Sequence, residues 1–278
     1  MADDLLFQQP LALMAAPRPS LTRGVTGANA EALAWLERFC KPTHDSRDSQ
    51  ENQSSLAAGR SQSVAGTQKE PGPRLGLEAT SLYLWGPPGC GKSFWTQAWA
   101  QESPGCHYVD LEDEDEALAF MQLLDKVRAR TWLLDNLHQA LNAEQLESAL
   151  FKLFVRSAET GERLVVTADR PPLQSLLQRE DLRTRLGQGL IFELQELSDT
   201  EKLKALRSRA FALGWMTQPD RPDYDSLFRF MLERLPRGLD QLTALMDAAD
   251  ARALALKKPV GLNLIRSLME GPIKNASA

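Results

Sequence analysis

The segment with the clearest capacity for chemistry is a glycine-rich loop that satisfies every fixed position of the pattern G-x-x-x-x-G-K-[ST], the Walker A phosphate-binding loop. Its residues are Gly86, Pro87, Pro88, Gly89, Cys90, Gly91, Lys92 and Ser93. Glycines let the backbone approach phosphates closely, and the start of the following helix adds partial positive charge. Lys92 is predicted to reach the outer phosphates of ADP or ATP, and the Ser93 hydroxyl to bind Mg²⁺. An ordinary glycine-rich turn is the alternative, and we expect only the backbone N–H of Cys90 to take part.

A second candidate group follows the apolar run 131–134, at Asp135 and Asn136. A strand that ends in Asp brings a carboxylate near the metal, so Asp135 is predicted to hold Mg²⁺ through water; a strand-ending turn residue is the alternative. Active ATPases usually carry a carboxylate at the next position, which here is Asn136. An amide can orient the attacking water but cannot accept its proton, and a general base contributes roughly 10²–10⁴ in rate. We therefore predict slow intrinsic hydrolysis.

Four further polar positions are ambiguous when the residues are considered alone. Asp169 follows the apolar run 164–167 and could reach a γ-phosphate or belong to a turn. Arg183 and Arg185 precede the last apolar run, and Arg237 precedes a helical segment; surface charge is the simpler interpretation of all three. The acidic run 112–116 is typical of a solvated loop whose last members favour a helix dipole.

The elements that must position these residues alternate along the chain. Short apolar runs at 82–85, 107–111, 131–134, 164–167 and 190–194 are separated by helical patterns at 93–102, 116–128 and 143–157. This alternation predicts an α/β fold with a doubly wound parallel sheet over residues 80–197. A capping box at Ser198–Glu201 then starts a helix that runs to about residue 213. Three more helical patterns, at 224–233, 238–253 and 262–270, predict a helical subdomain over 198–278.

The N-terminal part divides differently. Residues 1–20 form a predicted flexible tail, residues 21–41 contain an amphipathic helix at 29–40, and the polar stretch 42–79 is predicted to be a disordered insertion.

The 278-residue chain has no apolar run long enough to span a membrane, and its acidic start lacks the apolar region of a secretory signal. Three cysteines without paired or metal-like spacing suit a reducing cytoplasm. The net charge of −5 argues against a stand-alone nucleic-acid binder.

Taken in order, the motifs resemble those of the DnaA branch of the AAA+ ATPases and, within it, the regulatory members that inactivate the initiator. The similarity covers roughly residues 20–41 and 80–272. Besides the phosphate loop it is carried by Leu134-Asp135-Asn136, by Thr167-Ala168-Asp169-Arg170-Pro171-Pro172 and by Leu182-Arg183-Thr184-Arg185-Leu186-Gly187-Gln188-Gly189-Leu190. The resemblance implies an AAA+ core of about five parallel strands with a four-helix lid. Asp169 would be sensor 1, Arg185 an arginine finger that reaches a neighbour's γ-phosphate, and Arg237 sensor 2; residues 25–29 would lie near the adenine.

The same resemblance suggests partners. No basic helix-turn-helix follows the last helix, so we expect a regulator of DnaA rather than a DNA-reading initiator. Such regulators dock on the DNA polymerase sliding clamp, and Gln8, Leu11 and Leu13 are the candidate docking residues. The alternatives are a helicase-loader ATPase and, less well supported, a P-loop small-molecule kinase. The intact phosphate loop, degenerate in some regulators, leaves intrinsic ATP turnover open, and a homo-oligomer is also left open.

Overall fold

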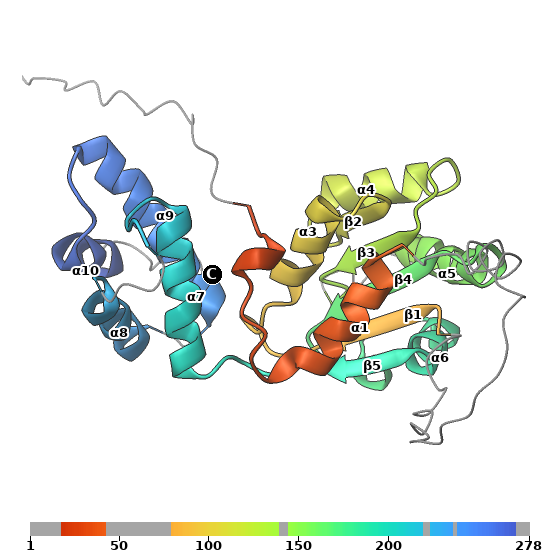
Figure 1. The fold of residues 1–278 in the computed structure, drawn as a ribbon. Helices are drawn as coiled ribbons and strands as arrows, with labels where there is room; N and C mark the ends of the chain where they lie inside the picture. Colours follow the sequence, from red (N-terminus) through yellow and green to blue (C-terminus); the bar gives the residue numbers. More distant parts are fainter. Residues whose placement is uncertain (1–17, 43–78, 139–143, 219–222, 236–237, 271–278) are drawn as a thin grey trace, which may run out of the picture.

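A computed structural model of the chain describes residues 18–42, 79–138, 144–218, 223–235 and 238–270. In them, a five-stranded parallel sheet with helices on both faces adjoins a group of helices (Figure 1). The strands are β1 (Ser81–Trp85), β2 (Cys106–Asp110), β3 (Thr131–Asp135), β4 (Arg163–Ala168) and β5 (Leu190–Glu193). Their spatial order is β2-β3-β4-β1-β5, with every neighbouring pair parallel. The predicted fold class is confirmed.

The two faces of the sheet bury alternate residues of the same strands. Leu82 and Leu84 of β1 pack with α1 (Ala30–Cys40) and α3 (Lys92–Glu102). Tyr83, between them, points to the opposite face. That face is covered by α4 (Glu114–Leu123), α5 (Glu144–Thr160) and α6 (Glu180–Gln188). Burial on both faces explains why the central strands β1, β3 and β4 have mostly apolar rather than alternating sequences.

Two helices on the second face differ from the sequence-based prediction. The acidic run caps α4 two residues earlier than expected, because the Asp113 carboxylate accepts the backbone N–H groups of Asp115 and Glu116. The same helix ends at Leu123 rather than near residue 128. Helix α6 was not predicted, because only Leu182 and Leu186 of its nine residues are buried, a stripe too short to produce a periodic signal.

The C-terminal helices form a second hydrophobic core. They are α7 (Asp199–Ala212), α8 (Asp225–Arg234), α9 (Leu239–Leu256) and α10 (Leu262–Glu270), and Phe228, Met231 and Met246 are completely buried among them. The predicted capping box is present: the Glu201 backbone N–H donates to Ser198 Oγ, and the Ser198 N–H donates to the Glu201 carboxylate. None of the described helices is both long and apolar enough to cross a bilayer.

The N-terminal segment lies between the two parts of the molecule (Figure 1). It forms two short helices, η1 (Leu21–Arg23) and η2 (Gly27–Asn29). The Leu21 N–H donates to Glu102 on α3 at 2.7 Å, and Ser208 on α7 donates to the Arg23 carbonyl at 3.4 Å. The Asn29 amide makes two hydrogen bonds with the main chain of Gln195, ahead of α7. The segment is thus tied to both the sheet region and the C-terminal helices.

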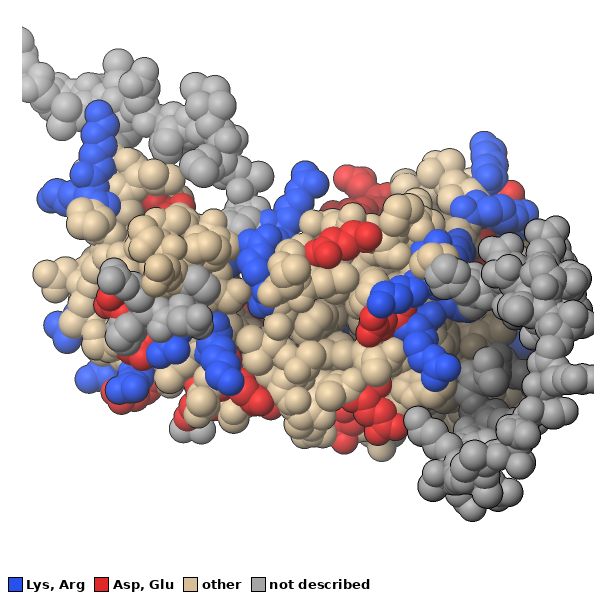
Figure 2. All heavy atoms as spheres, in the orientation of Figure 1, with Lys and Arg blue, Asp and Glu red and all other residues tan. Residues whose placement is uncertain are grey.

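Charged side chains of both signs are interspersed over the face of the molecule drawn in Figure 2. No extended basic surface is visible among the described residues on that face. This distribution agrees with the acidic balance of the whole chain and does not favour binding of a phosphate backbone there.

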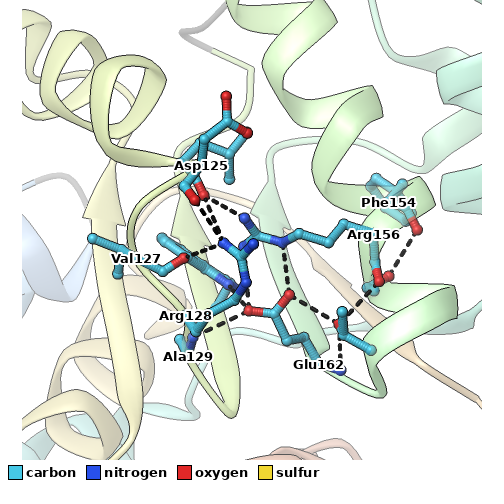
Figure 3. A network of polar contacts seen from close by, with 11 residues as sticks. Asp125, Val127, Arg128, Ala129, Phe154, Arg156 and Glu162 are labelled. Carbon is cyan, nitrogen blue, oxygen red and sulfur yellow. Dashed lines mark hydrogen bonds and ion pairs between the residues drawn. The ribbon is translucent and has the colours of Figure 1, made fainter.

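Glu162 is the centre of a polar network that joins α5, β3 and the turn that precedes β3 (Figure 3). Its carboxylate, only 6% exposed, accepts the Ala129 N–H, the indole N–H of Trp132 and two N–H groups of Arg156. Burial acts to raise the pKa of Glu162, but these hydrogen bonds outweigh it and lower the pKa. The network fixes the end of α5 to the turn that precedes β3.

This network should make the free energy of unfolding depend on pH in the acidic range. Because the folded pKa of Glu162 lies below its unfolded value of about 4.3, its stabilising contribution is complete above that pH and is lost as pH falls through the folded pKa. Glu162→Gln should lower the free energy of unfolding at pH 7 by about 1–3 kcal/mol. In urea titrations, the difference between wild type and variant should shrink between pH 5 and 3. A constant difference over that range would contradict the assignment.

A candidate nucleotide cavity between the phosphate loop and the C-terminal helices

A cavity of about 350 Å³ lies where the phosphate loop, the N-terminal segment and the C-terminal helices meet. This volume is in the range of small-molecule sites. The lining is contributed by four parts of the chain: Arg18, Pro19, Arg23, Gly24 and Val25; Gly89, Gly91, Ser93, Phe94 and Trp95; Leu197, Ala205, Ser208, Arg209 and Ala212; and Leu239, Asp240 and Thr243.

The phosphate loop connects β1 to α3, as the motif requires. Gly89 and Gly91 have positive φ values of 77° and 97°, and α3 begins at Lys92. The Lys92 side chain is 8% exposed, and its ammonium donates to the carbonyl oxygens of Gly86 at 2.7 Å and Pro87 at 3.0 Å. A buried cation held only by neutral acceptors is a strong attractor for an anion. Ser93 lines the cavity one residue further on, where a hydroxyl could bind Mg²⁺ together with nucleotide phosphates.

The start of α9 approaches the phosphate loop at Gly89. A Cβ atom on Gly89 would lie 2.8 Å from the Leu239 nitrogen and 2.9 Å from an Asp240 carboxylate oxygen. Only glycine therefore permits this contact between the loop and the C-terminal helices. Arg237, the predicted sensor 2, precedes α9 and lies outside the described residues.

Gly89→Ala should disrupt this junction. The substitution introduces a backbone clash as well as strain at a positive φ, so we expect nucleotide affinity to fall at least about tenfold. Gly161→Ala is the matched control, because Gly161 has a φ of 75° but open space around its Cβ position. Titration with a fluorescent adenine nucleotide measures both variants. Equal losses in the two would mean that strain or general destabilisation, and not the contact with α9, is responsible.

Other residues that line the cavity are aliphatic or basic. Val25, Leu197, Ala205 and Ala212 provide aliphatic surface, which suits the flat face of a base. Trp95 packs against Gly24 so closely that a Cβ on Gly24 would lie 2.1 Å from the indole. Arg18, Arg23 and Arg209 supply positive charge, and Arg209 also pairs with Asp247. The cavity thus combines an apolar compartment with a phosphate loop, as a nucleotide requires.

Asp135 ends β3 and is completely buried, with 0% exposure. One carboxylate oxygen accepts from the Tyr108 hydroxyl at 2.9 Å, and the other accepts from the Thr167 hydroxyl. Burial and the adjacent Asp135 charge raise the pKa of Tyr108, so this phenol remains a hydrogen-bond donor. These two hydroxyls, from β2 and β4, fix the orientation of the carboxylate. Asp135 does not line the cavity, so a role in holding Mg²⁺ remains a prediction.

Asn136 has a left-handed backbone conformation, with φ 56°, which Asn tolerates better than most residues. Its backbone N–H donates to Thr167 Oγ1 at 3.1 Å, and its side-chain amide donates to Asp110 Oδ1 at 2.9 Å. Active ATPases usually carry a carboxylate at the position of Asn136. Here the Asn136 amide instead donates a hydrogen bond to the carboxylate of Asp110, on the neighbouring strand β2.

Exchanging these two residues tests their coupling. Asn136→Asp places two carboxylates in contact and should cost about 1–3 kcal/mol of folding free energy, whereas Asp110→Asn leaves an amide pair that can still hydrogen-bond. The double variant Asp110→Asn/Asn136→Asp restores one amide and one carboxylate and should recover most of the loss. It also places a carboxylate next to Asp135, so intrinsic ATP turnover should rise. Denaturant unfolding and phosphate release measure the two effects; strictly additive losses would contradict the coupling.

The remaining predicted residues lie apart from the cavity. The Asp169 carboxylate, just after β4, pairs with the guanidinium of Arg170, which lowers the pKa of Asp169. Arg185 lies on α6, where its guanidinium is 5.0 Å from the ring centroid of Phe151 on α5. It borders a shallow surface hollow together with Glu180, Thr184 and Gln188. Among the described residues, no group of three or more His, Cys, Asp or Glu side chains could hold a metal ion.

The strand order, the phosphate loop after β1 and the C-terminal helical subdomain define an AAA+ type of P-loop fold. The family model described as the bacterial DnaA ATPase domain matches residues 58–193. Domain III of the Thermotoga maritima replication initiation protein DnaA is similar with a TM-score of 0.64 and 16% identity, over 93% of this chain and 98% of that one. AMPPCP-bound DnaA from Aquifex aeolicus has a TM-score of 0.56 and 14% identity, over 91% and 69%. The fold of this chain is therefore similar to that of the AAA+ domain of DnaA.

Several residues around the site were not identified from the sequence. Tyr108, Asp110 and Thr167 act on Asp135 and Asn136 from neighbouring strands, and Arg23 and Arg209 line the cavity from other elements. For Thr167 and Asp110 a signal existed, because each stands at or next to the carboxyl end of a predicted strand. Residues near the ends of parallel strands meet at one edge of the sheet, so polar side chains there are candidates for contact.

Proposed function

We propose that this chain is a regulatory DnaA-like protein, of the kind represented by the DnaA regulatory inactivator Hda, that binds ADP or ATP with Mg²⁺. Acting together with the DNA-loaded sliding clamp, it would promote hydrolysis of the ATP that is bound to DnaA. It would thereby limit replication initiation. The cavity supports nucleotide binding, because its apolar compartment and its phosphate loop match the two ends of a nucleotide. AMPPCP-bound DnaA of the same fold supports an adenine nucleotide.

The observation that carries the regulatory role is the position of Arg185. It lies on α6, outside the lining of the chain's own cavity, and is partly exposed at a surface hollow. An arginine placed there can act on the nucleotide of a neighbouring subunit, as an arginine finger does. A cation–π contact is worth only about 0.5–1 kcal/mol at an exposed site, so Phe151 orients Arg185 without trapping it.

The N-terminal end of α6 is also fixed by hydrogen bonds. Glu147 on α5 is 1% exposed, and its carboxylate accepts the backbone N–H groups of Gln178 and Arg179 at 2.8 Å each. A rigid support for α6 favours a role that demands accurate placement of a charge. Asn136, in place of a carboxylate, favours weak intrinsic hydrolysis and therefore action on a partner's nucleotide.

The test is hydrolysis of ATP bound beforehand to DnaA, with this chain added, in the presence and absence of DNA-loaded clamp. The proposal expects acceleration that requires the clamp. Gln8, Leu11 and Leu13, the proposed clamp-docking residues, lie outside the described residues, so their substitution by alanine tests docking directly. Absence of acceleration, combined with substantial ATP turnover by this chain alone, would instead favour a helicase-loader type of ATPase.

A further inference from the structure

At the end of the sheet where the strands begin, the structure brings together two cysteines whose positions in the sequence suggest no pairing. Cys40 is the last residue of α1 and Cys106 is the first residue of β2. The Cys106 thiol donates to the Cys40 carbonyl oxygen at a distance of 3.6 Å. The two cysteines are therefore in direct contact.

Arg130 and Ser103 complete the surroundings of this pair. One Arg130 nitrogen, Nη2, lies 3.9 Å from Cys106 Sγ and donates to Ser103 Oγ at 3.0 Å, and it also contacts the Cys40 carbonyl. A guanidinium beside a sulphur favours the thiolate. The hydrogen bond from Cys40, with further contributions from Ser103 and Arg130, lowers the pKa of Cys106 to about 6 against the opposing effect of burial.

The other two cysteines are in different surroundings. Cys40 is completely buried, and its hydrogen bond to Cys106 together with burial raises its pKa. Cys90 is buried in the phosphate loop, and burial raises its pKa as well, against the effect of Lys92. Cys106 alone of the three is partly exposed. A reagent from solution therefore meets Cys106 first, with Cys40 directly behind it.

We propose that Cys40 and Cys106 form a redox-active dithiol, in which a peroxide oxidises Cys106 and Cys40 then closes an intramolecular disulfide. In the first step the Cys106 sulphur attacks hydrogen peroxide; an S–O bond forms, the O–O bond breaks, and water leaves. In the second step the Cys40 sulphur attacks the sulfenic acid; the S–S bond forms, the S–O bond breaks, and a second water carries away the Cys40 proton. Two thiols are oxidised, and one peroxide is reduced to two waters.

The disulfide would fasten the end of α1 to the first residue of β2 and close a long chain loop. Cross-linking positions 66 residues apart restricts the unfolded chain and should raise the melting temperature. For a chain of this size the expected rise is several degrees. The proposal concerns residues away from the nucleotide cavity and does not depend on the proposed function.

The test uses the full reduced chain, treated with about one equivalent of hydrogen peroxide. Free thiols are then blocked with iodoacetamide, and the chain is digested without reductant for mass spectrometry. The proposal expects a Cys40–Cys106 cross-linked peptide, a thiol count in denaturant that falls from three to one, and a higher melting temperature that dithiothreitol reverses. Cys90→Ser is the matched control and should still form the cross-link.

The single variants separate the two roles. Cys40→Ser should stop at a sulfenic acid on Cys106, detected by dimedone labelling, whereas Cys106→Ser should form no intramolecular disulfide. Arg130→Met should slow the oxidation. Oxidation of Cys90 ahead of Cys106, cross-links only between chains, or three unreacted thiols after treatment would each overturn the proposal.

Discussion

Arg185→Ala should reduce the stimulated hydrolysis of DnaA-bound ATP to nearly the unstimulated rate. An arginine finger contributes roughly 10³–10⁵ in rate, because its charge neutralises the phosphoryl group in the transition state and not in the ground state. Binding to DnaA should therefore change little, while the single-turnover rate collapses. The measurement is a single-turnover assay with labelled ATP on DnaA, with clamp-loaded DNA present.

The control for this variant is on the same helix. Arg183→Ala removes an equal charge two residues away, but the Arg183 guanidinium donates to the Leu177 carbonyl at 3.2 Å and serves the local structure. It should retain most of the stimulation. Arg185→Lys keeps the charge and loses the planar fork, so only partial activity is expected. Normal stimulation by Arg185→Ala would refute the finger assignment.

Glu147→Gln addresses the placement of the finger rather than its charge. The two carboxylate oxygens of Glu147 each accept one backbone N–H at the start of α6. A glutamine amide has only one acceptor oxygen, so one of these hydrogen bonds should be lost. If α6 must be held rigidly, the stimulated rate should fall several-fold while Arg185 itself is intact and DnaA is still bound.

Lys92→Ala should weaken nucleotide binding by at least about tenfold and, with it, binding to DnaA. Loss of hydrogen bonds from a charged donor to phosphate costs about 1.5–3 kcal/mol, which corresponds to a loss in affinity of roughly ten- to a hundredfold or more. Partner binding should follow, because the phosphate loop contacts the start of α9 and bound nucleotide would hold the two parts of the molecule at one angle. Calorimetric titration with ADP and co-precipitation with DnaA measure the two losses.

Lys204→Ala is the matched variant, since Lys204 is an exposed lysine on α7 and its removal changes net charge by the same amount. It should bind nucleotide and DnaA as wild type does. A Lys92→Ala chain that loses nucleotide but still binds DnaA would disprove the coupling between the two events. Unchanged nucleotide affinity would disprove the site itself.

The strands were predictable because each contains a short apolar run that stands out against polar loops, and the central strands β1, β3 and β4 are buried on both faces. The bounds of each strand differ from the expected run by at most one residue; β1, for instance, begins at Ser81 rather than Leu82, and β5 ends at Glu193 rather than Leu194. Helix α6 was not predicted, although it carries the proposed finger, because its burial rests on Leu182 and Leu186 alone. A helix held by two leucines and by the Glu147 carboxylate from another element leaves little local pattern.

The partners of Asp135 and Asn136 depend on sheet register. Asp110 lies opposite Asp135 only because β2 and β3 pair in one particular alignment, and Thr167 reaches both residues from β4 on the other side. Sequence spacing carries no information about which residues stand opposite one another in strands joined by helices. The same applies to Cys40 and Cys106, which meet because α1 packs on the sheet.

The phosphate loop, the α/β order of elements and the helical C-terminal part could be predicted from the sequence alone. They follow from local residue patterns: glycines at fixed spacing, apolar periodicity and a capping box. The tertiary structure decided what surrounds the loop. The cavity exists because the N-terminal segment, α7 and α9 converge on Gly89 and Ser93. Arg185 lies outside the cavity because α6 packs against α5, on the face of the sheet opposite to α1 and α3. Such placement results from long-range packing, which no local pattern encodes.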